Sequence, residues 1–309
     1  MATWNDLVGQ FSATPDHLKQ DWLVNGFTGA LQAISREQDH RNVIYYGSAF
    51  LQKQNVPGAA ISITHEDING FMATVNGLDR AKGLTLILHT PGGVTNATET
   101  IVSYLRQCFT SIEVIVPAFA MSAGTMISLA SSRIIMPKHG QLGPIDPQMP
   151  LAGGATQSAR AIVEQFDQAK AEIAANPVAA HAWAPVTSSL GPALLQEASN
   201  ALEYSEEIVA NWLTNYMFAG DSDADAKGRR VAHHFNDASR HKSHGRRIGA
   251  KEAEEQGLTV TRLEESQTLQ EAVLDAYHRM TIMFEQTMMT KIIWSSEGKT
   301  WMKNWAGVS

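Results

Sequence analysis

The sequence is poor in cysteine and in long apolar runs, and each shortage excludes a class of protein. Cys108 is the only cysteine among 309 residues, so an internal disulfide and a cysteine-built metal site are excluded. A reducing cytoplasmic location is therefore expected. The most apolar stretch, residues 112–136, contains Glu113, Pro117 and Arg133. These residues predict short strands and a helix there rather than a membrane span.

Basic residues are also in short supply. Lysine and arginine number 24 against 31 acidic residues, which gives a formal net charge of −7. A general nucleic-acid binder needs a basic face, so no nucleic-acid partner is expected, although residues 240–247 form a local basic patch. The first residues lack a basic segment followed by an apolar one, so no secretory signal is predicted.

Hydrophobic residues make up 44% of the chain, which is enough for a sizeable core. Apolar runs at 58–64, 84–88, 112–116 and 133–136 predict strands, and amphipathic patterns at 65–78 and 96–109 predict helices between them. This alternation is typical of βαβ units around a mainly parallel sheet.

The sequence therefore predicts one α/β domain over residues 1–309, with its core at about 55–150 and 240–262. Residues 1–57 are expected to be helical. A helical insertion is predicted at 155–239, and a helical tail at 263–309. A strand-plus-helix unit is expected at 244–260.

Two turns of the predicted core are candidates for chemistry. The stretch LILHTPGGVTNATE (86–99) places Gly92 and Gly93 between a strand and a helix, where backbone N–H groups favour an anion. It lacks the lysine of a phosphate loop, so no nucleotide site is predicted. The stretch AFAMSAGTMI (118–127) places Ser122 at the next strand-to-helix turn. A plain packing role for the small residues explains Ala123 and Gly124 but not the combination of both turns.

The carboxyl ends of parallel strands meet at one edge of a sheet, so the two turns are expected to lie close together. Ser122 is then placed to attack a carbonyl group, and the N–H groups of Gly93 and Ala123 are placed to receive the oxyanion.

Polar residues further along the chain offer partners for a serine. Asp146 lies in the rigid stretch GPIDPQ, which suits a carboxylate that orients an imidazole, although an aspartate before proline is also a common turn residue. His241 and His244 follow His233 and His234 closely. A zinc site is an alternative for this cluster, but no HExxH pattern and no cysteine supports it.

Several of these motifs, in this order, resemble the Clp-fold serine peptidases, and most closely the serine dehydrogenase proteinase family, a distant relative of ClpP in the crotonase-like superfamily. The motifs are LILHTPGG, AFAMSAGTMI, MPKHGQLGPIDPQ and, late in the chain, KSHGRRIGAKEAEEQGL. The resemblance covers about residues 55–150 and 240–260. It implies a ClpP/crotonase-like βαβ superhelix.

The resemblance also implies a Ser-Asp-His triad, with Ser122 as nucleophile, Asp146 as orienting acid and His244 as base. Gly92, Gly93 and the N–H of Ala123 match the oxyanion positions of the superfamily. Membrane-bound relatives use a Ser-Lys dyad instead, but the nearest downstream lysines, Lys138 and Lys170, lie in no matching motif.

The expected function is that of a serine peptidase that cleaves peptides or unfolded proteins through an acyl-enzyme, without cofactor or metal. A crotonase-like acyl-thioester enzyme and a catalytically inactive Clp-like scaffold are the alternatives. A homo-oligomer, at least a dimer and preferably a trimer-based ring, is expected from the apolar stripe at 265–288 and from the resemblance. No ATP-binding loop is present, so ATP-driven unfolding would need a separate protein. The insertion at 155–239 is expected to restrict access to the site.

Overall fold

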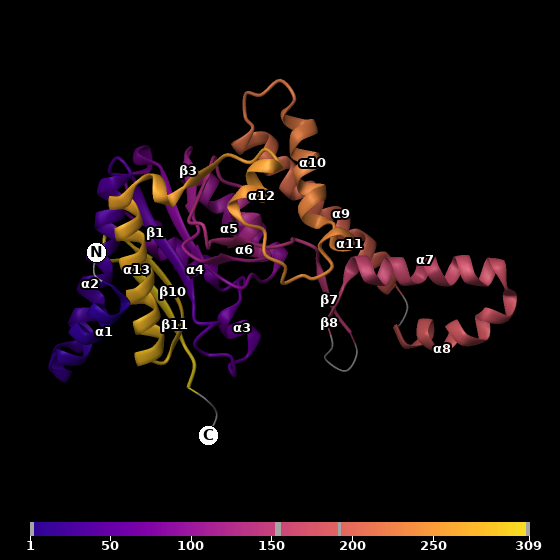
Figure 1. The fold of residues 1–309 in the computed structure, drawn as a ribbon, viewed down its shortest axis with the longest axis horizontal. Coiled ribbons are helices and arrows are strands. Elements are labelled where there is room, and N and C mark those ends of the chain that lie inside the picture. Colours follow the sequence, from indigo (N-terminus) through magenta and orange to yellow (C-terminus); the bar gives the residue numbers. More distant parts are fainter. Residues whose placement is uncertain (1–2, 152–155, 191–192, 307–309) are drawn as a thin grey trace. The chain divides into compact units, whose positions relative to one another are not determined.

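The structure is a computed structural model that describes residues 3–151, 156–190 and 193–306. The chain divides into two compact units (Figure 1), one formed by residues 1–142 and 248–309 and the other by residues 143–247. The helical insertion predicted at 155–239 falls inside the second unit, and its first residue lies outside the described residues.

The first unit is built on a seven-stranded sheet, as far as the structure describes the chain, with the order β11-β10-β1-β2-β3-β5-β9. Strands β1, β2, β3, β5 and β9 are parallel, and β10 and β11 extend the sheet as an antiparallel hairpin beside β1. The predicted α/β fold with a mainly parallel sheet is therefore confirmed. The strands are β1 (Asn42–Ser48), β2 (Leu84–His89), β3 (Ile112–Ile115), β5 (Ile134–Met136), β9 (Val260–Arg262), β10 (Met289–Ser295) and β11 (Thr300–Asn304).

Helices cover both faces of this sheet (Figure 1). On one face, Tyr45 of β1 packs in a core cluster with Phe27 of α2 and Met280 of α13. On the other face, Tyr46 stacks on Phe71 of α4, with ring centroids 6.1 Å apart. The helices of this unit are α1 (Trp4–Ala13), α2 (Lys19–Glu37), α3 (Gly58–Ile61), α4 (Asp67–Val75), α5 (Thr95–Cys108), α6 (Ala123–Leu129), α12 (Ala250–Glu255) and α13 (Gln267–Gln286).

Three local predictions differ from the structure. The strand predicted at 58–64 is wrong, because residues 58–61 form the one-turn helix α3 and only Ile63 makes a β-bridge. Strand β1 lies in the segment predicted to be helical, and β10 and β11 lie in the predicted helical tail. The apolar stripe of α13 packs against α2 of the same chain, so it gives no argument for an oligomer.

The second unit is mainly helical. Leu202 packs with Ile162 and Leu194 in a small core of its own. A short hairpin of β7 and β8 precedes the helices. The elements are β7 (Gln148–Pro150), β8 (Thr156–Ser158), α7 (Ala159–Ala175), α8 (Ala180–Leu190), α9 (Leu194–Trp212), α10 (Ala224–Asn236) and α11 (Ala238–His241).

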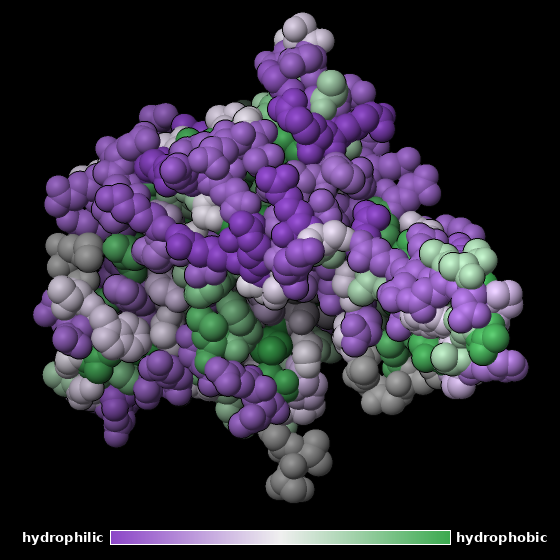
Figure 2. Space-filling model, turned by 45° about the vertical axis from the view of Figure 1, so that its right-hand side comes forward, coloured by the Kyte–Doolittle hydropathy of each residue, from purple (hydrophilic) through white to green (hydrophobic). Residues whose placement is uncertain are grey.

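The surface is mostly hydrophilic on the face seen in Figure 2, with apolar side chains in small groups. Large exposed apolar side chains come from several elements, among them Met72 of α4, Val178 before α8 and Met288 before β10. Among the helices of the described residues, none has the length and apolar character needed to cross a membrane.

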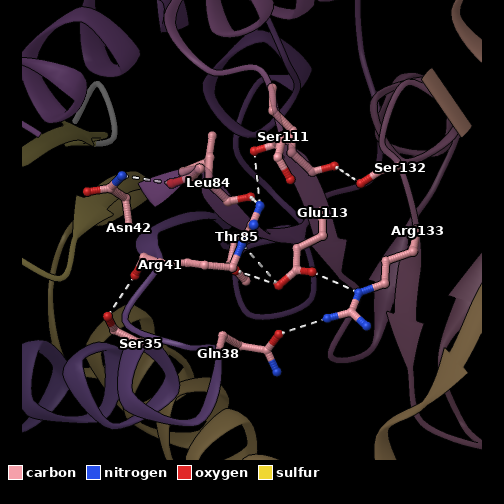
Figure 3. A network of polar contacts seen from close by, with 12 residues as sticks. Ser35, Gln38, Arg41, Asn42, Leu84, Thr85, Ser111, Glu113, Ser132 and Arg133 are labelled. Carbon is pink, nitrogen blue, oxygen red and sulfur yellow. Dashed lines mark hydrogen bonds and ion pairs between the residues drawn. The ribbon is translucent and has the colours of Figure 1, made fainter. Parts of the chain in front are cut away.

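A buried ionic network joins the beginnings of the parallel strands (Figure 3). Glu113 of β3 is 4% exposed and accepts hydrogen bonds from Thr85 Oγ1 and Arg133 Nε, both at 2.8 Å. Arg41 Nε lies 3.4 Å from the same carboxylate, and its Nη2 donates to the carbonyl oxygens of Leu84 and Ser111. The network therefore ties four strand starts together, at the edge of the sheet opposite the carboxyl ends.

Replacing Glu113 tests this role. We expect Glu113→Gln to lower the free energy of unfolding by about 2–3 kcal/mol, since two guanidinium groups lose their shared anion. Lys170→Met is the matched control, because its ion pair with Asp167 is 67% and 64% exposed and should contribute under about 1 kcal/mol. Urea denaturation measures both, and equal losses would contradict the assignment.

Candidate active site

Ser122 lies at a strained turn between a strand and a helix. The chain runs from β4 (Phe119–Ala120) through Met121 to Ser122, which is the N-cap of α6. Its backbone has φ 50° and ψ −115°, a region that a residue with a Cβ rarely occupies. The predicted strand-to-helix turn is confirmed. Such a turn presents a partly exposed serine hydroxyl at the end of a parallel sheet, as a nucleophile requires.

The double-glycine turn backs directly onto this serine. Gly92 has φ 104°, and a Cβ added there would lie 2.6 Å from Ser122 Cβ and 3.1 Å from the nitrogen of Ala123. Only glycine permits that approach and that φ. The N–H of Gly92 donates to Thr90 Oγ1 at 3.1 Å, so this group shapes the turn and is not a free donor.

Two other N–H groups of these turns remain open. Within the described part of the chain, the N–H groups of Gly93 and Ala123 have no acceptor. The direction of the Gly93 group follows from its neighbours. Ile63 N donates to Gly92 O at 2.8 Å and Ile63 O accepts from Val94 N at 2.9 Å. In such a parallel bridge the N–H of the middle residue, Gly93, points away from Ile63.

Close packing holds the serine turn against the end of β2. Thr90 N donates to Phe119 O at 2.9 Å, and Met121 N donates to Thr90 O at 3.1 Å. A Cβ at Gly124 would lie 2.5 Å from Thr90 Cγ2, so the small residue lets α6 approach this strand. The packing role of Gly124 and the partly exposed position of Ser122 therefore occur together.

The second unit contains an aspartate–histidine pair. His244 Nδ1 lies 2.8 Å from Asp146 Oδ1. The Asp146 side chain is 1% exposed and that of His244 is 30% exposed. Gln148 Nε2 donates to Asp146 Oδ2 at 2.7 Å. An ionised carboxylate only accepts hydrogen bonds, so Nδ1 carries the hydrogen and Nε2 is left as the basic atom.

A cavity of about 240 Å³ opens beside this pair within the second unit. Its walls carry charges of both signs, from Arg160, Glu164 and Lys242, together with the hydroxyl groups of Ser158 and Ser243. The imidazole of His244 therefore lies at a cavity that also carries charged and hydroxyl groups.

The segment that enters the second unit and the segment that leaves it are paired with each other at the boundary. Leu142 and Ile248 exchange two backbone hydrogen bonds, of 3.0 and 2.8 Å. Asp146 follows Leu142 by four residues, and His244 precedes Ile248 by four. Leu142 also belongs to β6 (Gln141–Leu142), which pairs in parallel with β4, the strand before Ser122.

The other histidines considered in the sequence have separate contacts. His241 Nε2 lies 2.7 Å from His234 O, and its Nδ1 lies 3.0 Å from Arg246 Nη1. His233 pairs with Glu206 at 3.2 Å. Over residues 3–151, 156–190 and 193–306, no group of three or more histidine, cysteine or acidic side chains is arranged to hold a metal ion.

His89, the last residue of β2, is buried and not exposed at the double-glycine turn that follows it. Its ring is fully buried between Phe50 and Tyr277, with centroid distances of 5.0 and 5.1 Å, and within the described residues neither ring nitrogen has a polar partner. Burial lowers the pKa of His89 to about 3. His139 is exposed, and its Nε2 lies 3.1 Å from Pro117 O.

Three residues of this region went unnoticed in the sequence. Thr90 accepts the Gly92 N–H, Gln148 holds Asp146, and Ile63 directs Gly93. Thr90 and Gln148 lie within two residues of predicted site residues, so proximity was the available signal. Ile63 lies thirty residues before Gly93 and gives no such signal.

A mostly parallel sheet with helices on both faces, carrying a serine at this turn, is consistent with a ClpP-like α/β fold. The family model described as ClpP-like SDH-type serine proteinase matches residues 58–179, which confirms the resemblance over that stretch. Two uncharacterized proteins of Methanocaldococcus jannaschii, MJ0137 and MJ1495, are 41% and 39% identical over 87 residues. The matched stretch covers 28% of this chain and 30% of each relative.

Gly93 gives a test of the turn. A Cβ there would lie 2.2 Å from Ile63 O, which is backbone and cannot swing aside. We expect Gly93→Ala to lower the free energy of unfolding by about 1–3 kcal/mol. Gly29→Ala in α2, where a Cβ meets nothing within 4 Å, should be neutral or stabilising and is the control. Thermal unfolding of both variants measures the difference, and equal effects would contradict the close approach.

The buried His89 predicts a dependence of stability on pH. The folded state holds the imidazole neutral down to about pH 3, whereas the unfolded chain binds a proton below about pH 6.5. The unfolded state therefore binds more protons, and stability falls as the pH drops through this window. His89→Leu should remove about 3 kcal/mol of the loss between pH 7 and 4. Denaturation at several pH values measures it, and an unchanged pH slope would contradict the prediction.

Proposed function

We propose that the protein is a serine peptidase in which Ser122 is the nucleophile. The observation that carries the proposal is the strained Ser122 turn beside the N–H groups of Gly93 and Ala123, which have no acceptor among the residues that the structure describes. A crotonase-like enolate chemistry needs the N–H groups but has no use for a serine at φ 50°. The match of residues 58–179 to a family of serine proteinases supports the same class.

In this proposal the Asp146–His244 pair supplies the base. The 2.8 Å contact to Asp146 fixes the tautomer that leaves Nε2 free to accept a proton. Chain connectivity supports the assignment. Both residues are tethered four residues from the paired Leu142 and Ile248, on the order of 14 Å of extended chain, and Leu142 pairs with the strand that leads to Ser122.

The reaction then follows from the atoms. Ser122 Oγ gives its proton to His244 Nε2 and bonds to the substrate carbonyl carbon, while the carbonyl oxygen takes up the negative charge and is held by the N–H groups of Gly93 and Ala123. The C–N bond breaks as the imidazolium returns the proton to the leaving amine. Water, deprotonated by the same imidazole, then hydrolyses the acyl-enzyme and restores Ser122.

Lys138 and Lys170 are less suited to act as the base. Both are exposed, and Lys170 is paired with Asp167. A lysine base has to be neutral, which requires burial. The triad therefore has the better support in this chain. Peptides or unfolded proteins are the proposed substrates. A homo-oligomer is also proposed, and a separate ATPase would be needed for ATP-driven unfolding.

Substitution of the triad tests the proposal. With a fluorogenic peptide or an unfolded protein as substrate, Ser122→Ala and His244→Ala should each lower kcat by about 10³-fold or more, and the double variant should lose little beyond that. Asp146→Asn should cost roughly 10²- to 10⁴-fold, because the imidazole takes the wrong tautomer. Covalent labelling by a fluorophosphonate should be lost in Ser122→Ala and kept in Ser103→Ala, an exposed serine of α5.

The outcomes separate the alternatives. Undiminished labelling or hydrolysis in folded Ser122→Ala would refute the nucleophile and leave the inactive scaffold or the enolate enzyme. Near-normal activity in folded His244→Ala would refute the base and favour a lysine. Circular dichroism of each variant establishes that it is folded.

A further inference from the structure

The segment that directs Gly93 belongs to no regular element. Residues 62–64 lie between the end of α3 and the start of α4, and Ile63 at the centre is fully buried. Its two hydrogen bonds to the double-glycine turn use its own N–H and C=O. This segment, the connection at 62–64, belongs to no helix or ladder of its own, so its position depends on the residues that flank it.

Those flanking residues are held by a buried ion pair. Lys291 Nζ donates to Ser62 O at 3.0 Å and lies 3.4 Å from Thr64 Oγ1 and 2.5 Å from Asp67 Oδ1. Thr64 N donates to Asp67 Oδ2 at 3.0 Å. The ammonium group and the carboxylate thus bind Ser62 and Thr64, the residues on either side of Ile63.

The ion pair is itself fixed to the sheet. Lys291 lies on β10, where it is paired in register with Ser48 at the end of β1. Tyr46 of β1 donates through its hydroxyl to Asp67 Oδ2 at 2.9 Å. Ser48 Oγ donates to the carbonyl oxygen of Ile61, just before the connection. Residues of β1 and β10 therefore hold the connection at 62–64 to the sheet.

Stability alone is a weak reason for such a pair. Both side chains are 0% exposed, and burial is the main cause of a lowered pKa for Lys291. Moving two charges out of water costs several kcal/mol, and apolar residues of similar size often serve the fold as well or better. An apolar core would not fix the orientation of residues 61–67. The ion pair does, because its hydrogen bonds, and those of Tyr46 and Ser48, reach specific atoms of this segment.

We propose that the buried Lys291–Asp67 pair, with Tyr46, is a positioning device for the oxyanion donor of Gly93. The inference rests on the proposed function. The ion pair holds Ser62 and Thr64, these hold Ile63, and Ile63 sets the direction of the Gly93 N–H. None of the three side chains touches the substrate, so each is a positioning residue and not a catalytic one.

The test replaces the whole network by apolar residues, so that no buried group is left unpaired. In the variant Tyr46→Phe, Asp67→Leu and Lys291→Met, the fold should persist, whereas kcat for peptide hydrolysis should fall by about 10- to 100-fold with KM within about twofold. Fluorophosphonate labelling of Ser122 should slow in parallel. Unchanged kcat in the folded triple variant would overturn the proposal.

Amide hydrogen exchange gives a readout that does not need activity. The N–H groups of Ile63 and Val94 donate across the bridge, so both should exchange faster in the triple variant while the amides of β2 keep their protection. Unchanged exchange at Ile63 and Val94 would overturn the positioning role. If the unaltered protein shows no Ser122-dependent hydrolysis, the proposed function fails, and exchange still decides whether the network holds the turn.

Two single variants serve if the triple variant does not fold. Tyr46→Phe removes one hydrogen bond to Asp67 and keeps the shape of the ring, and we expect a fall in kcat of about 2- to 5-fold. Glu113→Gln disturbs the other buried ionic network, at the opposite edge of the sheet, and should lower the melting temperature without changing kcat. Unchanged kcat in Tyr46→Phe, or an equal fall in Glu113→Gln, would refute the inference.

Discussion

Two backbone hydrogen bonds, between Ile63 and the residues on either side of Gly93, set the position on which the candidate site depends. They leave the Gly93 N–H facing outward and bring the double-glycine turn against Ser122. The residues around this contact make it possible. Glycine at 92 and 93 permits the approach, Thr90 takes up the spare N–H of Gly92, and Gly124 lets α6 settle on the end of β2.

The sheet uses buried charge in two different ways at its two edges. At the strand starts, Glu113 pairs with two arginines that are themselves partly exposed, and the contacts run to side chains and to backbone carbonyl groups at the strand starts. Near the carboxyl ends, Lys291 and Asp67 are excluded from water, and their contacts run to the connection at 62–64, which is hydrogen-bonded to the turn that carries the candidate donor Gly93. The Glu113 network joins strands of the sheet to one another. The Lys291–Asp67 network instead holds the connection at 62–64, which is not a strand of the sheet.

The parts of the fold that the sequence predicts are those with strong local patterns. The apolar runs of β2, β3 and β5 and the amphipathic pattern of α5 lie where expected. The strand predicted at 58–64 was wrong because Ile61 and Ile63 alternate as in a strand. In the structure Ile61 ends a one-turn helix, and Ile63 makes a single β-bridge. Strand β1 was not predicted because only four residues, with no proline or glycine among them, separate NVIYYGS from the long helix α2.

The candidate site divides in the same way. Ser122, Gly92 and Gly93 have local signals, since each sits at a turn after an apolar run. The pairing of Asp146 with His244 came from the resemblance, and the structure brings these two side chains together. Lys291 had no signal, because it lies in the tail that was predicted to be helical, a lone lysine is usually exposed, and its partner Asp67 lies 224 positions earlier.

The late place of β10 in the chain has a consequence for synthesis. A ribosome releases the nucleophile, both glycines and the connection at 62–64 long before it releases Lys291. Until β10 emerges and pairs with β1, Asp67 lacks its cation and the double-glycine turn lacks its anchor. If the ion pair positions the Gly93 N–H as proposed, a nascent chain that already contains Ser122 gains this alignment only after β10 has paired with β1.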